Sequence, residues 1–360
     1  MTVAGRRRTR VLFVALKYDY GVPNRGYSYE YENFYDTLMH MDSLDVTLFP
    51  FDEIMRQKGR KEMNSQLLEV VEALRPDISF FFIFTDEIAK ETIRTISQRG
   101  DTITINWFAD DHWRFDEFSR YWAPLFHRAI TTDQISFDNY QRIGCRNAIM
   151  SQYGCNHFLY KNGDVTPEHD VTFVGQVHSH RESTVRELAD SGIRVECWGR
   201  GWPNGRLSQE EMILLYPKSK INLNFSDSSV VFNRKQLLKI FLSRRADDTL
   251  TVRLPGETVA HVKTLFSNRR SQVKGRVFEV PAAGGFLLTQ HADGIENFFV
   301  PGKEIATFTD VDDLRDKIRY YLAHDDERES IRRAGHERAL KEHTLQRRFE
   351  DIFDTIKRTS

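Results

Sequence analysis

The chain has 360 residues, of which 40% are hydrophobic and 29% are charged. At about 150 residues per domain, this length predicts two domains with separate cores and excludes a disulfide-stapled mini-protein. Lys and Arg number 51 against 52 Asp and Glu, which leaves a formal charge of -1. No overall field would attract nucleic acid or acidic lipid, so we expect neither as a partner.

The longest apolar run near the N-terminus, Val11–Leu16, is too short for a signal sequence or a membrane span. We therefore expect a buried strand there and no membrane span. The 3 cysteines, Cys145, Cys155 and Cys197, form no C-x-x-C pair and cannot all pair with one another. Reduced thiols in a cytoplasmic protein, with no structural zinc site, are the interpretation that fits.

The first half alternates short apolar runs with amphipathic segments, which is typical of a parallel sheet with crossover helices. The predicted strands are Arg10–Leu16, Asp45–Pro50, Ile78–Phe84, Thr102–Phe108 and Ala129–Thr131. The predicted helices are Glu30–Met41, Glu62–Leu74, Glu87–Gln98 and Phe115–Leu125.

A second α/β series follows the polar stretch Lys161–Asp170, which reads as a linker. Its predicted strands are Val171–Val174, Ile193–Trp198, Lys220–Phe225 and Gly285–Thr289. Its predicted helices are Arg181–Asp190, one from Val277 through Ala283, and one that Asp310 caps, with an apolar stripe of Leu314, Ile318, Tyr321 and Leu322.

Three parts of the chain follow from these patterns: an N-terminal domain (1–165), a second domain (166–342) and a terminal helix (343–360). The terminal helix carries Phe349, Ile352, Phe353 and Ile356 on one face. Residues 226–274 break the alternation and contain two Arg pairs. We interpret them as an insertion that contributes to acceptor recognition or to a homodimer contact.

Two doubly wound α/β domains in tandem bind ligands at the carboxyl ends of their strands, and a cleft between the domains is the default site. A nucleotide-dependent transferase, a dehydrogenase and a hinged binding protein all fit this architecture.

The stretch Lys274–Thr289, followed by Gly294-Ile295-Glu296 and Pro301–Glu304, narrows the choice. It resembles the signature of group 1 glycosyltransferases with the GT-B fold, specifically their CgeB-like (spore-maturation protein) branch. The resemblance covers about Asp170 to Phe353 and, more loosely, the first domain at Trp107–Asp111. It implies two Rossmann-like domains that face a cleft, with the terminal helix crossing back to the first domain.

The resemblance also implies a hexosyltransferase-like enzyme that moves a sugar from a nucleoside diphosphate sugar to an acceptor hydroxyl. The nucleotide sugar is a co-substrate, and we expect neither cofactor nor metal, because GT-B enzymes use protein cations instead. His178-Ser179-His180 is too weak a pattern to assign a metal. A nucleotide-sugar epimerase of the same fold, or a non-catalytic sugar-binding or scaffold protein, is the alternative.

Three residues near the start of the predicted helix at Val277 are candidates for the donor site. Glu279 is suited to accept hydrogen bonds from the ribose hydroxyls, while Lys274 and Arg276 are suited to neutralise the diphosphate. The small residues Ala282–Gly285 allow the backbone to lie close to a ligand and to the sheet. The alternative is an ordinary acid at a helix N-terminus beside solvated cations. One departure from the family is Ser271, where many relatives carry a further Glu.

The loop after Gly175 faces the donor in the family, which makes Arg181 a candidate contact for the diphosphate. By the same resemblance, the loop with Trp198 and Arg200 lies against the nucleobase, where a planar side chain can stack. A partnerless Arg in a helical turn and a structural Trp are the alternatives.

In the first domain, Asp110, Asp111 and His112 follow the fourth predicted strand. Relatives place an acid or a His there, near the acceptor, where it can take the proton of the acceptor hydroxyl. Asp111 as a helix cap is the alternative. The Tyr-rich loop that follows the first predicted strand adds Asp19, Tyr27 and Glu30 as acceptor-binding candidates, although it also fits an ordered surface loop.

Overall fold

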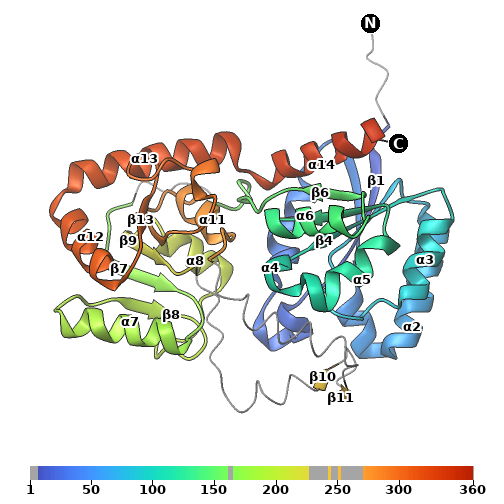
Figure 1. The fold of residues 1–360 in the computed structure, drawn as a ribbon, viewed down its shortest axis with the longest axis horizontal. Helices are drawn as coiled ribbons and strands as arrows, with labels where there is room; N and C mark the ends of the chain where they lie inside the picture. The colour runs from blue at the N-terminus through green and yellow to red at the C-terminus, as the bar shows by residue number, and fades with distance from the viewer. Residues whose placement is uncertain (1–6, 161–164, 227–241, 245–249, 253–270, 360) are drawn as a thin grey trace, which may run out of the picture. The chain divides into compact units, whose positions relative to one another are not determined.

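The computed structural model describes residues 7–160, 165–226, 242–244, 250–252 and 271–359. The chain divides into two compact units, which we describe separately (Figure 1). Unit 1 comprises residues 1–152, 232–267 and 349–360, and unit 2 comprises residues 153–231 and 268–348.

Unit 1 contains a six-stranded parallel sheet with the order β2-β1-β3-β4-β5-β6. The strands are β1 (Thr9–Ala15), β2 (Leu44–Pro50), β3 (Ile78–Phe81), β4 (Ile103–Phe108), β5 (Arg128–Thr131) and β6 (Ala148–Met150). The apolar runs predicted all but the last of these. The β6 strand was missed because three residues that are not fully buried carry no periodic signal.

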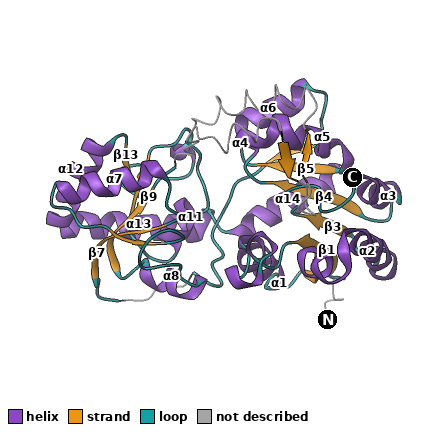
Figure 2. Ribbon diagram, turned by 90° about the horizontal axis from the view of Figure 1, so that it is seen from below, coloured by secondary structure: helices purple, strands orange, loops and turns teal. Residues whose placement is uncertain are grey.

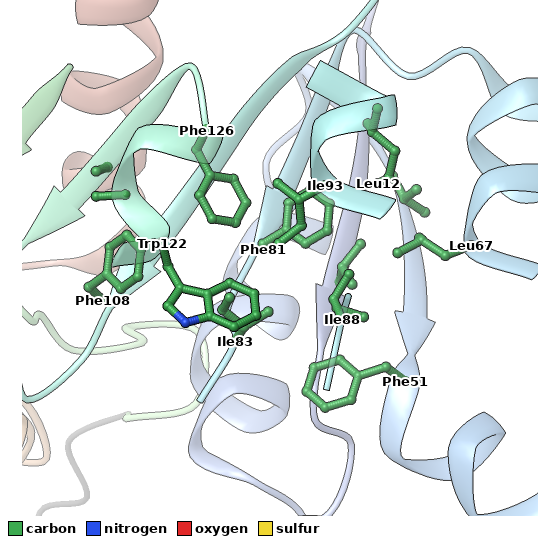
Figure 3. Packing of buried hydrophobic residues seen from close by; sticks show 14 of the residues in the cluster. Leu12, Phe51, Leu67, Phe81, Ile83, Ile88, Ile93, Phe108, Trp122 and Phe126 are labelled. Carbon is green, nitrogen blue, oxygen red and sulfur yellow. The ribbon is translucent and has the colours of Figure 1, made fainter. Parts of the chain in front are cut away.

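The two faces of this sheet bury alternate residues of the same strands. Leu12 and Phe81 pack with Leu67 and Ile93 of the helices α2 (Phe51–Leu74) and α3 (Lys90–Gln98), as Figure 3 shows. On the other face, Phe80 and Trp107 contact Phe34, and Phe80 and Phe34 contact Phe349. Phe349 belongs to the terminal helix α14 (Leu345–Thr359), so the end of the chain helps to cover the first sheet.

Two of the predicted helices of unit 1 are less regular than the sequence indicates. The segment predicted as Glu30–Met41 is a π-helix at Glu30–Tyr35 followed by α1 (Asp36–Met39). The segment predicted as Phe115–Leu125 begins earlier, with α4 (Asp111–Arg114), and then includes a π-helix at Phe115–Ser119. Apolar spacing does not distinguish these windings from an α-helix, and π-helical turns occur frequently at functional sites.

The rest of the predicted helix Phe115–Leu125 consists of α5 (Arg120–Trp122) and a 3-10 turn at Ala123–Leu125. A further helix, α6 (Gln134–Arg142), was not predicted from the sequence. The helix predicted at Glu62–Leu74 begins earlier, at Phe51. Gly59, with φ 83°, interrupts the helical backbone, and for this reason the sequence predicts only the part that follows it.

Unit 2 contains a five-stranded parallel sheet with the order β13-β12-β9-β7-β8, and in each unit the strands lie between helices (Figure 2). The strands are β7 (His169–Val174), β8 (Glu196–Trp198), β9 (Ser219–Asn224), β12 (Leu287–Gln290) and β13 (Ala306–Phe308). The helices are α7 (Ser179–Asp190), α8 (Gln209–Leu215), α11 (Arg276–Ala282), α12 (Val311–Ala323) and α13 (Asp325–Glu342).

The predicted cap and stripe of α12 are confirmed. The Asp310 carboxylate accepts a hydrogen bond of 2.9 Å from the Asp313 amide, and Leu314, Ile318 and Tyr321 are buried. The sequence does not predict α8, α13 and β13, because these segments are short or highly charged. Most of the predicted insertion lies outside the described residues. Its described part consists of residue 226, residues 271–274 and an antiparallel pair of strands, β10 (Leu242–Arg244) and β11 (Leu250–Val252).

Each sheet reverses its strand order once. In unit 1, β1 lies between β2 and β3, and in unit 2, β7 lies between β8 and β9. At such a point the loops diverge at the carboxyl end of the sheet and leave a crevice that ligands use. The loops after β1 and β3, and those after β7 and β9, are therefore where a site is expected. Among the described residues, no helix is both long and apolar enough to cross a bilayer.

Candidate functional site

In unit 2, Arg181 joins the two loops at the strand reversal. Its guanidinium donates to the Gln176 carbonyl (3.0 Å), after β7, and to the Phe225 carbonyl (3.4 Å), after β9. The same group lies over the Phe173 ring, 5.5 Å from its centre. Backbone carbonyls of both loops thus hold the predicted donor residue Arg181 at the carboxyl edge of the sheet.

The loops after β7 and β8 pack against each other with little space between them. Gly175 donates its amide to the Trp198 carbonyl (2.8 Å), and the Trp202 indole donates to the Gly175 carbonyl (2.9 Å). A Cβ atom on Gly199, which has φ 132°, would lie 2.2 Å from the Gly175 carbonyl oxygen. Gly175 itself has no room for a Cβ, which would meet the Phe173 ring at 2.6 Å. These glycines allow a rigid edge to form beside Arg181.

Positive charge gathers at this edge. Partial desolvation and then the nearby charges of Arg181 and Lys274 lower the pKa of His178, which precedes α7. The structure therefore brings the predicted pair Arg181 and Lys274 into electrostatic reach of one imidazole. Helix N-termini favour anions, so the start of α7 adds to the attraction of two cations. The sequence gives His178 no role in the site, because His178-Ser179-His180 is too weak a pattern to assign a metal.

Glu279 and Arg276 form an ion pair on α11, with Glu279 buried and Arg276 partly exposed. Glu279 is 3% exposed, and its carboxylate lies 3.7 Å from the Arg276 guanidinium. Burial raises the pKa of Glu279, while Arg276 and a hydrogen bond from Tyr160 oppose the rise. The Arg276 guanidinium also donates to the Tyr216 hydroxyl, and Gln209 donates to the Tyr160 hydroxyl (2.7 Å). Both predicted residues are thus held by neighbours within unit 2.

The remaining donor candidates occupy different environments. Gly285 is needed for packing within the protein, since a Cβ there would lie 2.8 Å from the side-chain nitrogen (Nδ2) of Asn222. The Trp198 ring packs edge-on against His169, with 5.6 Å between the ring centres. Arg200 is exposed, and its carbonyl accepts the Val177 amide (2.9 Å).

In unit 1, the Tyr-rich loop after β1 is an ordered structure. The Asp52 carboxylate accepts the amides of Lys17 (2.8 Å) and Tyr18 (3.0 Å), and Asp19 pairs with Arg25 (2.9 Å). Tyr27 is 49% exposed and stacks on Tyr18, with ring centres 5.7 Å apart. The loop therefore presents a half-exposed aromatic ring on a fixed backbone.

Glu30 opens the π-helix that follows this loop. Desolvation, opposed by hydrogen bonds from its own amide and from Ser28, raises the pKa of Glu30 to about 7. The negative charges of Asp19 and Asp52 contribute to the rise. A carboxyl group with this pKa exchanges protons near neutral pH, as a general acid or base must.

Asp110, Asp111 and His112 follow β4 but differ in exposure. Asp111 is completely buried, and its carboxylate accepts a hydrogen bond of 3.0 Å from the Tyr140 hydroxyl. His112 is 5% exposed. Asp110 is partly exposed and has a left-handed backbone, with φ 59°. Of the three side chains, Asp110 is the one open to a substrate.

Two residues missed by the sequence analysis connect the loops of unit 1. Tyr20 in the loop after β1 is 66% exposed, has φ 51°, and contacts Phe84 in the loop after β3, with ring centres 6.2 Å apart. The charge of Asp110 also raises the pKa of Tyr20, after desolvation and Asp19. The candidate residues of unit 1 therefore meet at the strand reversal. Contact across separate loops has no signal in the sequence.

No group of three or more His, Cys, Asp or Glu side chains that could hold a metal ion occurs in the part of the chain that the structure describes.

Residues 181–354 match a family model described as Glycosyl transferase-like. No curated protein matches the chain significantly. The glycosyltransferase from Rickettsia africae ESF-5 superposes with a TM-score of 0.62 at 10% identity, covering 99% of this chain and 100% of that chain.

Two further solved structures are similar over nearly the whole chain. HepE from Anabaena in complex with UDP-glucose has a TM-score of 0.57 at 10% identity, covering 97% of this chain and 100% of that chain. Sucrose-phosphate synthase from Thermosynechococcus elongatus has a TM-score of 0.55 at 9% identity, covering 98% and 100%. The predicted GT-B fold, with two Rossmann-like parallel-sheet units, is confirmed. The findings support the resemblance to group 1 glycosyltransferases, while the CgeB-like branch stays a prediction.

Proposed function

We propose that the protein is a glycosyltransferase of the CgeB-like branch that binds a nucleoside diphosphate sugar in unit 2 and an acceptor hydroxyl in unit 1. The observation that carries the proposal is the gathering of Arg181, Lys274 and the start of α7 at the strand reversal of unit 2. A diphosphate is the common ligand that best matches two cations and a helix N-terminus.

The chemistry follows from these positions. The acceptor oxygen bonds to the anomeric carbon of the sugar, the bond from that carbon to the diphosphate oxygen breaks, and the acceptor proton passes to a carboxylate. The leaving diphosphate gains negative charge, which Arg181 and Lys274 stabilise without a metal. Glu279 accepts hydrogen bonds from the ribose hydroxyls. Asp110, with Glu30 as the second candidate, receives the proton of the acceptor hydroxyl.

UDP is the nucleotide to test first, because HepE was solved with UDP-glucose. The experiment is a calorimetric titration of the full chain, without added metal, with UDP, GDP, dTDP, ADP and CDP. We expect UDP to bind selectively, and K274M to weaken binding by about tenfold or more, since it removes a charge-assisted contact.

Lys220 supplies a matched control within unit 2, because it pairs at 2.7 Å with Asp170 at the other end of the sheet. K220M should leave the affinity for UDP unchanged. If no nucleotide binds, or if K274M and K220M behave alike, the proposed donor site is wrong.

A further inference from the structure

Arg114 is a buried cation at the carboxyl end of the unit 1 sheet. It is 7% exposed and is the last residue of α4. Its guanidinium carbon lies 4.2 Å from the centre of the Phe84 ring, 4.4 Å from that of Phe118 and 5.5 Å from that of Trp113. Distances below about 6 Å are typical of cation–π contacts.

The edge of the guanidinium plane is unoccupied within the described residues. No hydrogen bond or ion pair there engages the Arg114 guanidinium, and none of its nitrogens is among the buried polar atoms that lack a partner. The nitrogens therefore contact solvent. A guanidinium carries five N–H groups, and those in contact with solvent are open to donate hydrogen bonds to a ligand.

The nearby carboxyl groups act on Arg114 only over a distance. Glu117, Asp110, Glu87 and Asp111 lie within electrostatic reach of it. Glu87 accepts the Thr85 amide (2.7 Å), and Asp111 accepts the Tyr140 hydroxyl. Burial lowers the pKa of Arg114, and the charges of these carboxyl groups oppose that fall.

The loop that carries Phe84 is held rigidly from α2. Arg60 donates to the Asp86 carbonyl (2.8 Å), and Asn64 donates to the Glu87 carbonyl (3.1 Å) while accepting the Ala89 amide (2.7 Å). A site supported in this way requires little ordering when a ligand binds.

We propose that Arg114 binds a carboxylate or phosphate group of the acceptor, so that the acceptor is an anionic carbohydrate or polyol. The planar fork of Arg matches such groups through two parallel hydrogen bonds. The neighbouring ring of Tyr20, which contacts Phe84, offers a face for the acceptor. This inference rests on the proposed function, in which unit 1 holds the acceptor.

The test is a calorimetric titration of the full chain with three probes: methyl glucuronide, neutral methyl glucoside and inorganic phosphate. The variants are R114M, R114K and R120M. Arg120 is the matched control, because it also lies near aromatic rings, 6.0 Å from Phe115 and 5.5 Å from Tyr121, but pairs with Asp116 at 3.1 Å. UDP binding is measured on every sample.

We expect an anionic probe to bind about tenfold or more tightly than the glucoside, and to lose that preference in R114M but not in R120M. R114K should retain part of it. Tighter binding of glucuronide indicates a carboxylate acceptor, and tighter binding of phosphate indicates a phosphorylated one. Denaturant unfolding of R114M and R120M shows whether unit 1 is folded in each variant, since UDP binding reports on unit 2.

The proposal is overturned if neither anion binds below about 10 mM, if glucoside binds as well as glucuronide, or if R114M and R120M behave alike. Failure of UDP to bind any sample instead contradicts the donor site, and the anion titrations still report on Arg114.

Discussion

Asp111 is a carboxyl group that the chain buries completely at the start of α4. Burial raises its pKa to about 7 from an ordinary 3.8, against the hydrogen bond from the Tyr140 hydroxyl. The folded chain therefore binds this proton more tightly than the unfolded chain does. Stability contributed by Asp111 falls as pH rises from 3.8 to about 7, and it stays low above that range.

Replacing Asp111 with Asn removes the ionisation and keeps an oxygen that can accept from Tyr140. We compare the free energy of unfolding of D111N with that of the wild type at each pH. This difference should shift in favour of D111N by on the order of 2 kcal/mol from about pH 5 to about pH 8. Denaturant unfolding at the two pH values measures the change. D138N, at an exposed position, is the control. Equal pH dependence in D111N and the wild type would show that Asp111 ionises freely.

At the scale of elements, the loops after β7 and β8 depend on Gly199. A Cβ there would overlap the Gly175 carbonyl, whereas a Cβ on Gly205, at φ 68°, would meet nothing within 4 Å. We expect G199A to lower the free energy of unfolding by roughly 2–4 kcal/mol and to weaken UDP binding. G205A should cost about 1 kcal/mol and leave UDP binding intact. Unfolding curves and titrations on both variants check this, and similar losses in the two would contradict the packing that we describe.

The terminal helix α14 is the second element to test. Phe349 is completely buried against Phe34 and Phe80 of unit 1, so we expect F349A to cost about 3–5 kcal/mol. Leu340 of α13 is 37% exposed, and L340A should change the free energy of unfolding by less than about 1 kcal/mol. Chemical denaturation followed by Trp fluorescence measures both. A small effect of F349A would mean that α14 does not stabilise the first sheet.

The sequence predicted elements better than it predicted contacts between them. Uniformly apolar runs such as Val11–Leu16 indicate strands of a parallel sheet, because both faces of such a sheet are buried. The π-helices at Glu30–Tyr35 and Phe115–Ser119 were not predicted, since their apolar spacing is that of an ordinary helix.

The candidate sites were predicted only in part for the same reason. Resemblance to the family identified Arg181 and Lys274 as candidates. The position of His178 near both of them depends on the folded structure and could not be predicted from the sequence. Arg114 lies beside the predicted Asp110, Asp111 and His112, yet its importance comes from two rings that belong to different segments.

At the scale of the whole molecule, the two units repeat one plan. Each has a parallel sheet whose order reverses once, and each gathers polar groups on the loops at that reversal. The charges of the two edges differ: Arg181 and Lys274 are cations in unit 2, while unit 1 carries the acids Asp110 and Glu30 as well as the buried cation Arg114. We assign the diphosphate of the donor to unit 2 because two cations and a helix N-terminus gather there.

Hydrogen exchange of the full chain with and without UDP-glucose tests that assignment most directly, because it requires neither an acceptor nor a variant. We predict that UDP-glucose slows exchange in the loop at 175–181 and in the segment at 274–279. Protection confined to the loops of unit 1 that follow β1 and β3, or no protection at all, would contradict the account.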